Sequence, residues 1–190
     1  FIPFKCVDHT DTDAVVTITN TPDGEKRIRN VYGDRVLVIP YVMPGFVLAK
    51  TIYDLTRDVD WKRYDGMVLL NHGLFTFSDN VRESYEKMIQ LVSDAETYLE
   101  NHAPLNWSDD EPDEDLLTLA GMRGAVSRVK GEAMVARLDS GSRAVAFSRC
   151  EGVDEIATRG TLTPDHVIRT KPIPVVIKDD VVTSVERYAS

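Results

Sequence analysis

The sequence is poor in cysteine. Cys6 and Cys150 are the only two in 190 residues, and neither belongs to a C-x-x-C pair. A framework of several disulfides and the paired cysteines of many structural zinc sites are therefore excluded. We expect both thiols to be buried side chains in a reducing compartment, which favours a cytoplasmic protein.

Long apolar runs and glycine-rich nucleotide motifs are also missing. No segment reaches the ~20 consecutive apolar residues of a membrane helix, and no basic stretch followed by an apolar run marks a secretory signal. The pattern G-x-G-x-x-G does not occur, so we do not expect this chain to bind NAD. The expected partners therefore include no membrane.

Positive charge is the third scarcity. The chain has 22 Lys and Arg against 31 Asp and Glu, a net charge of −9. Such a surface repels phosphate backbones, so we expect no nucleic-acid partner. An anionic substrate would have to bind at a local cluster of basic side chains or backbone N–H groups. With 43% hydrophobic and 28% charged residues, the composition is that of a soluble globular protein.

Strand and helix patterns alternate along the first half of the chain. Residues 13–20 are rich in β-branched types and end at Thr-Pro-Asp-Gly, which predicts a strand and a turn. Residues 34–41 and 66–70 are further apolar strands, the second of the continuous kind buried on both faces. Apolar spacing predicts a helix over 46–57. This order indicates an α/β layered domain.

The clearest helical pattern covers residues 79–101. Ser78, Asp79 and Asn80 offer its cap, and Glu83 lies three residues after Asn80, as in a capping box. One apolar stripe is expected to face the core, with charged residues opposite. Its members are Val81, Tyr85, Met88, Ile89, Val92 and Leu99.

An acidic, proline-containing stretch over 101–115 interrupts this pattern and reads as an exposed linker. We place a domain boundary there, giving regions 1–108 and 109–190. Beyond it we predict helices over 115–129 and 152–158. Strands are predicted over 133–138, 143–148 and 173–177. Because the sequence opens at Phe1 rather than Met, we expect part of the first region to precede it.

His72 stands where the strand over 66–70 meets a glycine. The ends of strands in an α/β sheet are where ligands usually bind, and Gly73 lets the backbone turn sharply beside the imidazole. A single histidine does not decide between a functional side chain and a structural one. Both interpretations therefore stay open at this stage.

His9 and Asp11 are two residues apart, so in an extended segment both point to the same side. They could converge on one cation, with His72 as a third ligand. Nitrogen and oxygen donors of this kind suit Zn²⁺ or another first-row divalent ion. The alternative is that His9, Asp11 and Asp13 are only turn and cap residues. A further histidine, His166, lies near Arg169 and could either contact a phosphate or belong to a structural loop.

Several motifs resemble the class II aldolase/adducin family over nearly the whole chain. The strongest is Asn71-His72-Gly73-Leu-Phe-Thr-Phe, preceded by Met-Val-Leu-Leu. His9-Thr10-Asp11 corresponds to the family's His-x-His pair. The stretch Asp34-Arg-Val-Leu-Val-Ile-Pro-Tyr and Arg159-Gly-Thr-Leu-Thr-Pro-Asp-His are similar to the aldolase part of bifunctional rhamnulose-1-phosphate aldolase/alcohol dehydrogenases.

The resemblance implies an α/β/α layered aldolase-like domain with a smaller C-terminal α+β extension. It also implies that His9, Asp11 and His72 bind a divalent metal, expected to be zinc. Asn71 and Gly73 are expected to contact a small sugar phosphate. The implied reaction is metal-assisted retro-aldol cleavage of a deoxyketose 1-phosphate such as rhamnulose 1-phosphate, in a homo-oligomer.

The sequence departs from the family pattern in two places that matter. Asp11 stands where the family has a second histidine, which adds negative charge to the site. The family's catalytic carboxylate would fall before Phe1, so no catalytic residue is assigned within the chain. A non-catalytic binding or scaffolding module, as in adducin, is therefore the alternative to an aldolase. A related epimerase or decarboxylase is a third possibility.

Overall fold

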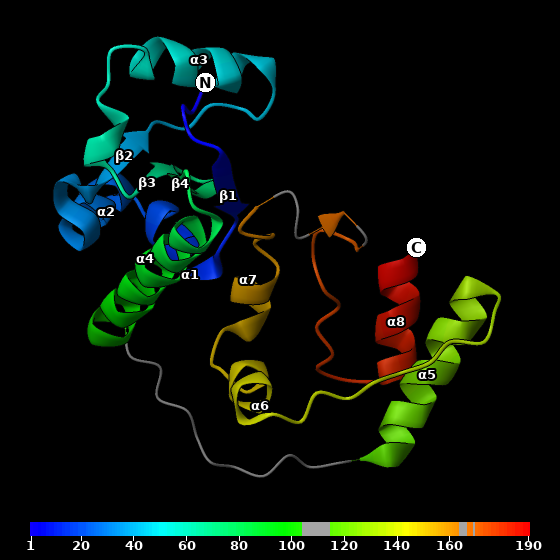
Figure 1. Ribbon diagram of the computed structural model, residues 1–190. Helices are drawn as coiled ribbons and strands as arrows, with labels where there is room; N and C mark the ends of the chain where they lie inside the picture. The colour runs from blue at the N-terminus through cyan, green and yellow to red at the C-terminus, as the bar shows by residue number, and fades with distance from the viewer. Residues whose placement is uncertain (104–114, 164–166, 169) are drawn as a thin grey trace. The chain divides into compact units, whose positions relative to one another are not determined.

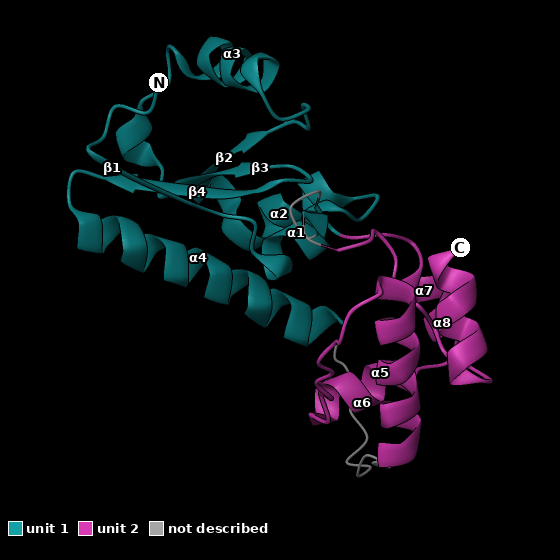
Figure 2. Cartoon of the chain, turned by 90° about the vertical axis from the view of Figure 1, so that its right-hand side faces the viewer, with its two compact units in different colours: residues 1–105, 162–168 teal, residues 106–161, 169–190 magenta. Residues whose placement is uncertain are grey.

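The computed structural model describes residues 1–103, 115–163, 167, 168 and 170–190, which fall into two compact units (Figure 2). Unit 1 comprises Phe1–Leu105 and Leu162–Ile168, and unit 2 comprises Asn106–Thr161 and Arg169–Ser190. Among the described helices, none is long and apolar enough to cross a membrane.

Unit 1 is built on one four-stranded sheet. Its strands are β1 (Cys6–Thr10), β2 (Val36–Ile39), β3 (Gly66–Leu69) and β4 (Gly73–Ser78). They lie in the order β1-β4-β3-β2; β4 is antiparallel to both neighbours, whereas β2 and β3 are parallel. The helices of this unit are α1 (Asp13–Thr19), α2 (Gly24–Tyr32), α3 (Phe46–Thr56) and α4 (Val81–His102), with short 3₁₀ turns at Gly33–Arg35 and Trp61–Arg63 (Figure 1).

Each face of the sheet is covered by helices, as Figure 2 shows. Successive side chains of a strand point to opposite faces. On β3, Val68 therefore packs with α1, α2 and α4, whereas Met67 and Leu69 pack on the other side with Leu48 of α3 and with Trp61. The predicted α/β class and its layered α/β/α order are confirmed.

The prediction of a strand over 13–20 is wrong, because these residues form helix α1. Ala14, Val15 and Ile18 pack in the core with the sheet, α2 and α4, and Val16 is also fully buried. A short continuous apolar run fits a buried helix as well as a buried strand, and tertiary packing decides between them. The sequence also concealed α2, whose buried Gly24, Ile28 and Tyr32 recur every four residues.

The helix predicted over 79–101 is confirmed, but its buried stripe is rotated. Ser84, Met88, Leu91 and Ala95 are buried. Val81, Tyr85 and Ile89, which we expected in the core, are exposed. Small residues such as Ser84 and Ala95 let the helix lie close to the sheet, so the closest face is not the most hydrophobic one.

The cap of α4 is Asn80, as expected, but Glu83 does not close a direct capping box. The Asn80 side-chain oxygen accepts from the backbone N–H groups of Arg82 and Glu83. In a direct capping box the Glu83 carboxylate would accept from the Asn80 backbone N–H. Here the Ser78 hydroxyl bridges these two groups, because it accepts from the Asn80 N–H and donates to Glu83. The reciprocal bond therefore runs through Ser78.

Helices are the only regular secondary structure among the described residues of unit 2. It contains α5 (Leu116–Lys130), α6 (Ser142–Ser148), α7 (Val153–Ala157) and α8 (Val181–Ala189). The strands predicted over 133–138, 143–148 and 173–177 are therefore wrong, and the second of these segments is α6. Strands need a neighbouring strand to pair with, and the described part of this unit offers none.

Candidate metal centre

His9 projects from β1 on the same side of the sheet as Phe75, its register partner on β4. The two rings stack with their centroids 4.0 Å apart. The Nδ1 of His9 lies 3.0 Å from the carbonyl oxygen of Leu74. Because a carbonyl only accepts, Nδ1 carries the proton, and in the neutral ring Nε2 then presents its lone pair.

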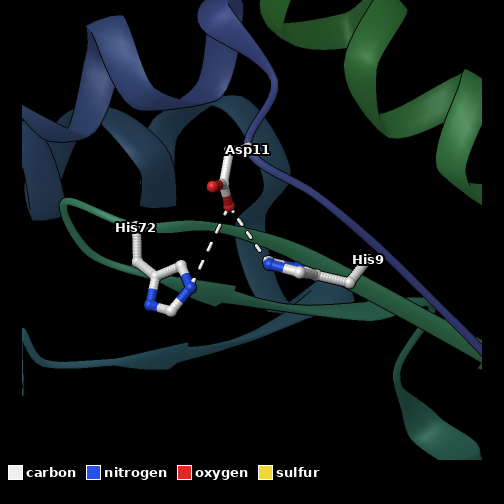
Figure 3. A group of neighbouring side chains, drawn as sticks. All are labelled: His9, Asp11 and His72. Atoms are coloured by element: carbon white, nitrogen blue, oxygen red, sulfur yellow. Dashed lines mark ion pairs between the residues drawn. The ribbon is translucent and has the colours of Figure 1, made fainter. Parts of the chain in front are cut away.

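Asp11 follows β1 directly and directs its carboxylate towards both histidines (Figure 3). Its Oδ1 lies 3.1 Å from Nε2 of His9 and 3.9 Å from Nε2 of His72. The side chain is only 18% exposed. The residue at the N-cap of α1 is Thr12. Asp11 therefore lies one residue before the N-cap, and its role as a metal ligand stays a prediction beside the alternative of a turn residue.

His72 lies in the three-residue connection between β3 and β4, where Leu69 pairs with Gly73. Its side chain is 19% exposed, and its ring centroid is 5.3 Å from that of His9. The Nε2 atom faces Asp11, whereas Nδ1 is buried without a hydrogen-bond partner among the described residues. The ring is thus oriented towards the carboxylate.

The three side chains form a donor set for a metal ion. One ligand atom from each of His9, Asp11 and His72 lies within 4.8 Å of the others. Two imidazoles and one carboxylate are ligands that Zn²⁺ and other first-row divalent ions accept. A lone pair on Nε2 of neutral His9 facing a carboxylate oxygen at 3.1 Å is repulsive unless a proton or a cation lies between them. The residues therefore fit a divalent cation.

Gly73 gives the site the space it needs. A Cβ built at this position would lie 2.6 Å from the carbonyl oxygen of Thr10, 2.7 Å from Oδ1 of Asp11 and 3.1 Å from Cε1 of His9. The first of these atoms is backbone and cannot move cheaply. A glycine here therefore permits β4 to pass close to two ligands at once.

Asn71 is held by the end of α1, which the sequence did not reveal. Its backbone N–H donates to the Thr19 hydroxyl at 3.2 Å, and its Nδ2 donates to Oδ1 of Asn20 at 2.7 Å. Because residues 13–20 were expected to form a strand, nothing indicated that Thr19 and Asn20 would lie beside His72. A helical spacing of apolar residues over 13–20 is the pattern that would have predicted these contacts.

The remaining histidines lie away from this set or outside the described residues. His102 ends α4, where its Nδ1 bonds the carbonyl oxygen of Tyr98 and its ring stacks on Tyr98. His166 and Arg169 are not among the residues that the structure describes. The proposed phosphate contact there stays a prediction.

Family models match both halves of the chain. One described as the class II aldolase and adducin N-terminal domain matches residues 2–99, and one described as aldolase class II, second domain, matches residues 113–190. The chain belongs to the class II aldolase and adducin family. This confirms the family expected from the Asn71-His72-Gly73 motif.

One relative matches nearly all of this chain but only part of its own length. The uncharacterized oxidoreductase YuxG of Bacillus subtilis (strain 168) is 31% identical over 189 residues, which cover 93% of this chain but 27% of that relative. The chain thus spans little more than a quarter of that protein.

Two solved structures are similar to parts of the chain. The N-terminal class II aldolase domain of a conserved protein from Thermoplasma acidophilum is 40% identical, covers 51% of this chain and 43% of that chain, and has a TM-score of 0.45. An aldolase II superfamily protein from Pseudomonas syringae is 17% identical, covers 79% and 56%, and has a TM-score of 0.41.

Proposed function

We propose that this chain is a metal-dependent aldolase that cleaves a ketose 1-phosphate, with a deoxyketose 1-phosphate such as rhamnulose 1-phosphate as the leading substrate. The observation that carries the proposal is the convergence of His9, Asp11 and His72, whose ligand atoms lie within 4.8 Å of one another. These residues come from β1, from the segment after it and from the β3–β4 connection. The family supports the same reaction class.

His9, Asp11 and His72 would hold the ion, and zinc is the ion we propose. A divalent ion bound there supplies Lewis acidity, which polarises a carbonyl and stabilises the negative charge that develops during carbon–carbon cleavage. The carbonyl of Leu74 fixes the tautomer and the ring orientation of His9, as second-layer partners of metal ligands commonly do. Asp11 supplies negative charge that offsets part of the ion's charge.

The cleavage itself balances without a redox partner. The bond between C3 and C4 of the ketose breaks, the C4 hydroxyl loses its proton to become an aldehyde, and the electron pair stays on C3. Protonation of C3 then yields dihydroxyacetone phosphate. Within the chain we propose that Asn71 and Gly73 contact the sugar phosphate, and that the protein acts as a homo-oligomer.

Oxidoreductase activity is not part of the proposal, although the Bacillus subtilis relative carries that name. The chain matches only 27% of that relative. Its own sequence contains no G-x-G-x-x-G motif to bind the pyrophosphate of a dinucleotide. The second candidate is a binding or scaffolding module on the same fold. The observation in its favour is Asp11, whose charge weakens the Lewis acidity of a bound ion relative to a third histidine.

The test is to load the protein with one equivalent of Zn²⁺ or Mn²⁺ and follow release of dihydroxyacetone phosphate from a panel of ketose 1-phosphates. An aldolase gives metal-dependent release that chelation abolishes and that His72→Ala lowers to background. His102→Ala, a histidine outside the donor set, should retain the wild-type rate. A protein that binds the metal but releases nothing from any member of the panel would favour the binding module. A protein that binds no divalent ion would refute the aldolase.

A further inference from the structure

Asn71 is the only non-glycine residue with a positive φ among the described residues, at 57°. This left-handed conformation is unfavourable for an L-residue, although asparagine tolerates it better than most. Asn71 directly precedes His72 within the short connection between Leu69 and Gly73. A change of its backbone to an extended conformation would therefore turn the His72 ring away from Asp11.

Two neighbouring residues, the last of α1 and its C-cap, bond to Asn71. The Thr19 hydroxyl accepts from the Asn71 backbone N–H, and it also donates to the carbonyl oxygen of Val16 at 3.1 Å. Since its single proton is used by Val16, the lone pair of the hydroxyl is fixed towards Asn71. Asn20, the C-cap of α1, accepts from the Asn71 side-chain amide.

The end of α1 is itself firmly placed. Thr19 is only 4% exposed, and a Cβ at Gly24 would lie 2.2 Å from the carbonyl oxygen of Thr19, so the first turn of α2 packs directly against it. The Nδ2 of Asn20 donates to the carbonyl oxygen of Leu162 at 3.1 Å. Leu162 belongs to the returning segment of unit 1. The end of α1 is therefore held in place on several sides, and the β3–β4 connection bonds to it through Asn71.

We propose that Thr19 and Asn20 are positioning residues of the metal centre: by holding Asn71 in its left-handed conformation, they keep the Nε2 atom of His72 directed at Asp11. This inference rests on the proposed metal-binding role of His9, Asp11 and His72. Neither residue belongs to the proposed donor set. Their effect passes through the backbone of a single residue, Asn71.

The chain contains a matched control for Thr19. Thr56 is the last residue of α3, as Thr19 is of α1, and it is 3% exposed. Its hydroxyl donates to the carbonyl oxygen of Ile52 at 2.7 Å, the same kind of bond that Thr19 makes to Val16. Thr19→Val and Thr56→Val thus remove equivalent helix-end bonds, but only the first removes an acceptor from Asn71.

Metal affinity is the first readout, measured by titrating the metal-free protein with Zn²⁺ and by the visible absorption of the Co²⁺ form. Substitution of residues that orient metal ligands typically lowers affinity by ~10–100-fold. We expect a loss in this range for Thr19→Val, an altered Co²⁺ spectrum, recovery in Thr19→Ser, and wild-type behaviour in Thr56→Val. Asn20→Ala should show a smaller loss, and because Asn20 is exposed, this variant does not depend on repacking of the core.

Two variants of Asn71 distinguish the effect of its backbone conformation from that of its side-chain hydrogen bond. Asn71→Gly keeps the left-handed conformation accessible and loses only the bond to Asn20, whereas Asn71→Ala also loses the conformational preference. We expect the affinity of Asn71→Ala to be lower than that of Asn71→Gly. Equal affinities would show that the φ angle is not what matters.

Amide hydrogen exchange in the metal-free protein is a second readout that does not depend on any ion. The Asn71 amide should exchange slowly in the wild type and in Thr56→Val, and at least about tenfold faster in Thr19→Val, because its acceptor is lost. Wild-type metal affinity in Thr19→Val would overturn the inference, whether or not the exchange of the Asn71 amide changes. A wild-type protein that binds no ion would overturn the proposed function instead, while the exchange data would still decide whether Thr19 holds Asn71.

Discussion

Unit 1 and unit 2 differ in how their residues are buried. In unit 2 the buried apolar side chains among the described residues are Ala125, Val145 and Val185, and all the others belong to unit 1. Unit 2 also exposes Leu117 and Val135 almost completely. The three proposed metal ligands lie on β1, directly after it and in the β3–β4 connection of unit 1, whose sheet has a packed core on each face. We therefore expect substitutions that disturb the core of unit 1 to change metal affinity, and substitutions in unit 2 to leave it unchanged.

The largest expected effect is that of a methyl group at Gly73. Gly73→Ala forces a Cβ into the Thr10 carbonyl and Asp11, so we expect a loss of ~1–3 kcal/mol in stability and at least about a tenfold loss of metal affinity. Gly66→Ala is the control, because its Cβ would meet the Phe75 carbonyl at 2.5 Å without contacting a ligand. Denaturation and metal titration of both variants check this. Equal loss of affinity in the two would mean that the sheet as a whole, not the site, is responsible.

The next effect compares one buried valine from each unit. Val68 on β3 is fully buried, and Val185 on α8 is 5% exposed. Val68→Ala should lower the free energy of unfolding by about 2 kcal/mol, because it loses buried apolar surface and leaves a cavity. Val185→Ala should lower it less, because fewer buried side chains surround this position and the cavity can close. Hydrogen exchange resolved by residue shows which unit loosens in each variant. A larger loss for Val185→Ala would contradict the contrast between the units.

Tyr32 gives a smaller effect with a pH signature. Burial raises the pKa of its phenol well above the ordinary value, and the charge of Asp94 adds to this, while Arg35 opposes it. The hydroxyl donates to the carbonyl oxygen of Leu91 at 2.7 Å. The folded state therefore favours the neutral phenol. The contribution of Tyr32 to the free energy of unfolding is fully present below pH ~10 and is lost as the pH rises from there towards the raised pKa.

Tyr32→Phe should cost ~1 kcal/mol near neutral pH and flatten the alkaline decline of the unfolding free energy. The control is Tyr188→Phe in unit 2, where a phenol donates to the carbonyl oxygen of Ile173. That variant should leave the decline in place, because Tyr32 is retained. Denaturant unfolding measured across the alkaline range distinguishes them, and an unchanged decline in Tyr32→Phe would count against this role of Tyr32.

The smallest effect is expected at Gly121 in α5, and it has the opposite sign. Nothing lies within 4 Å of a Cβ built there. Alanine in a helix interior is favoured over glycine by about 0.5–1 kcal/mol, so Gly121→Ala should stabilise unit 2 by up to that amount without changing metal affinity. Thermal unfolding and metal titration measure both. A destabilised Gly121→Ala would show that this face of α5 is covered in solution.

Much of the centre could be predicted from local patterns. The position of His72 follows from an apolar strand that ends at Asn71-His72-Gly73. His9 and Asp11 are two residues apart, so their side chains point to the same side where the backbone is extended. Both patterns depend only on the residues themselves. Their convergence depends on β1 pairing with β4, which no local pattern in the sequence indicates.

The errors arose where tertiary packing decides the structure. Residues 13–19 are apolar and β-branched, yet they fold as α1 because both the sheet and the neighbouring helices cover them. That error also concealed Thr19 and Asn20, whose contacts with Asn71 exist only at the end of a helix. In unit 2, Ser142–Ser148 forms a helix without strand partners nearby. Intrinsic preference is a weak guide for such short segments.

Metal stoichiometry tests the central claim most directly. The metal-free protein is titrated with Zn²⁺ and followed by calorimetry, alongside His72→Ala and His102→Ala. The account predicts one ion per chain in the wild type and in His102→Ala, and loss of that site in His72→Ala. Equal binding by the wild type and His72→Ala, or no binding by the wild type, would contradict it.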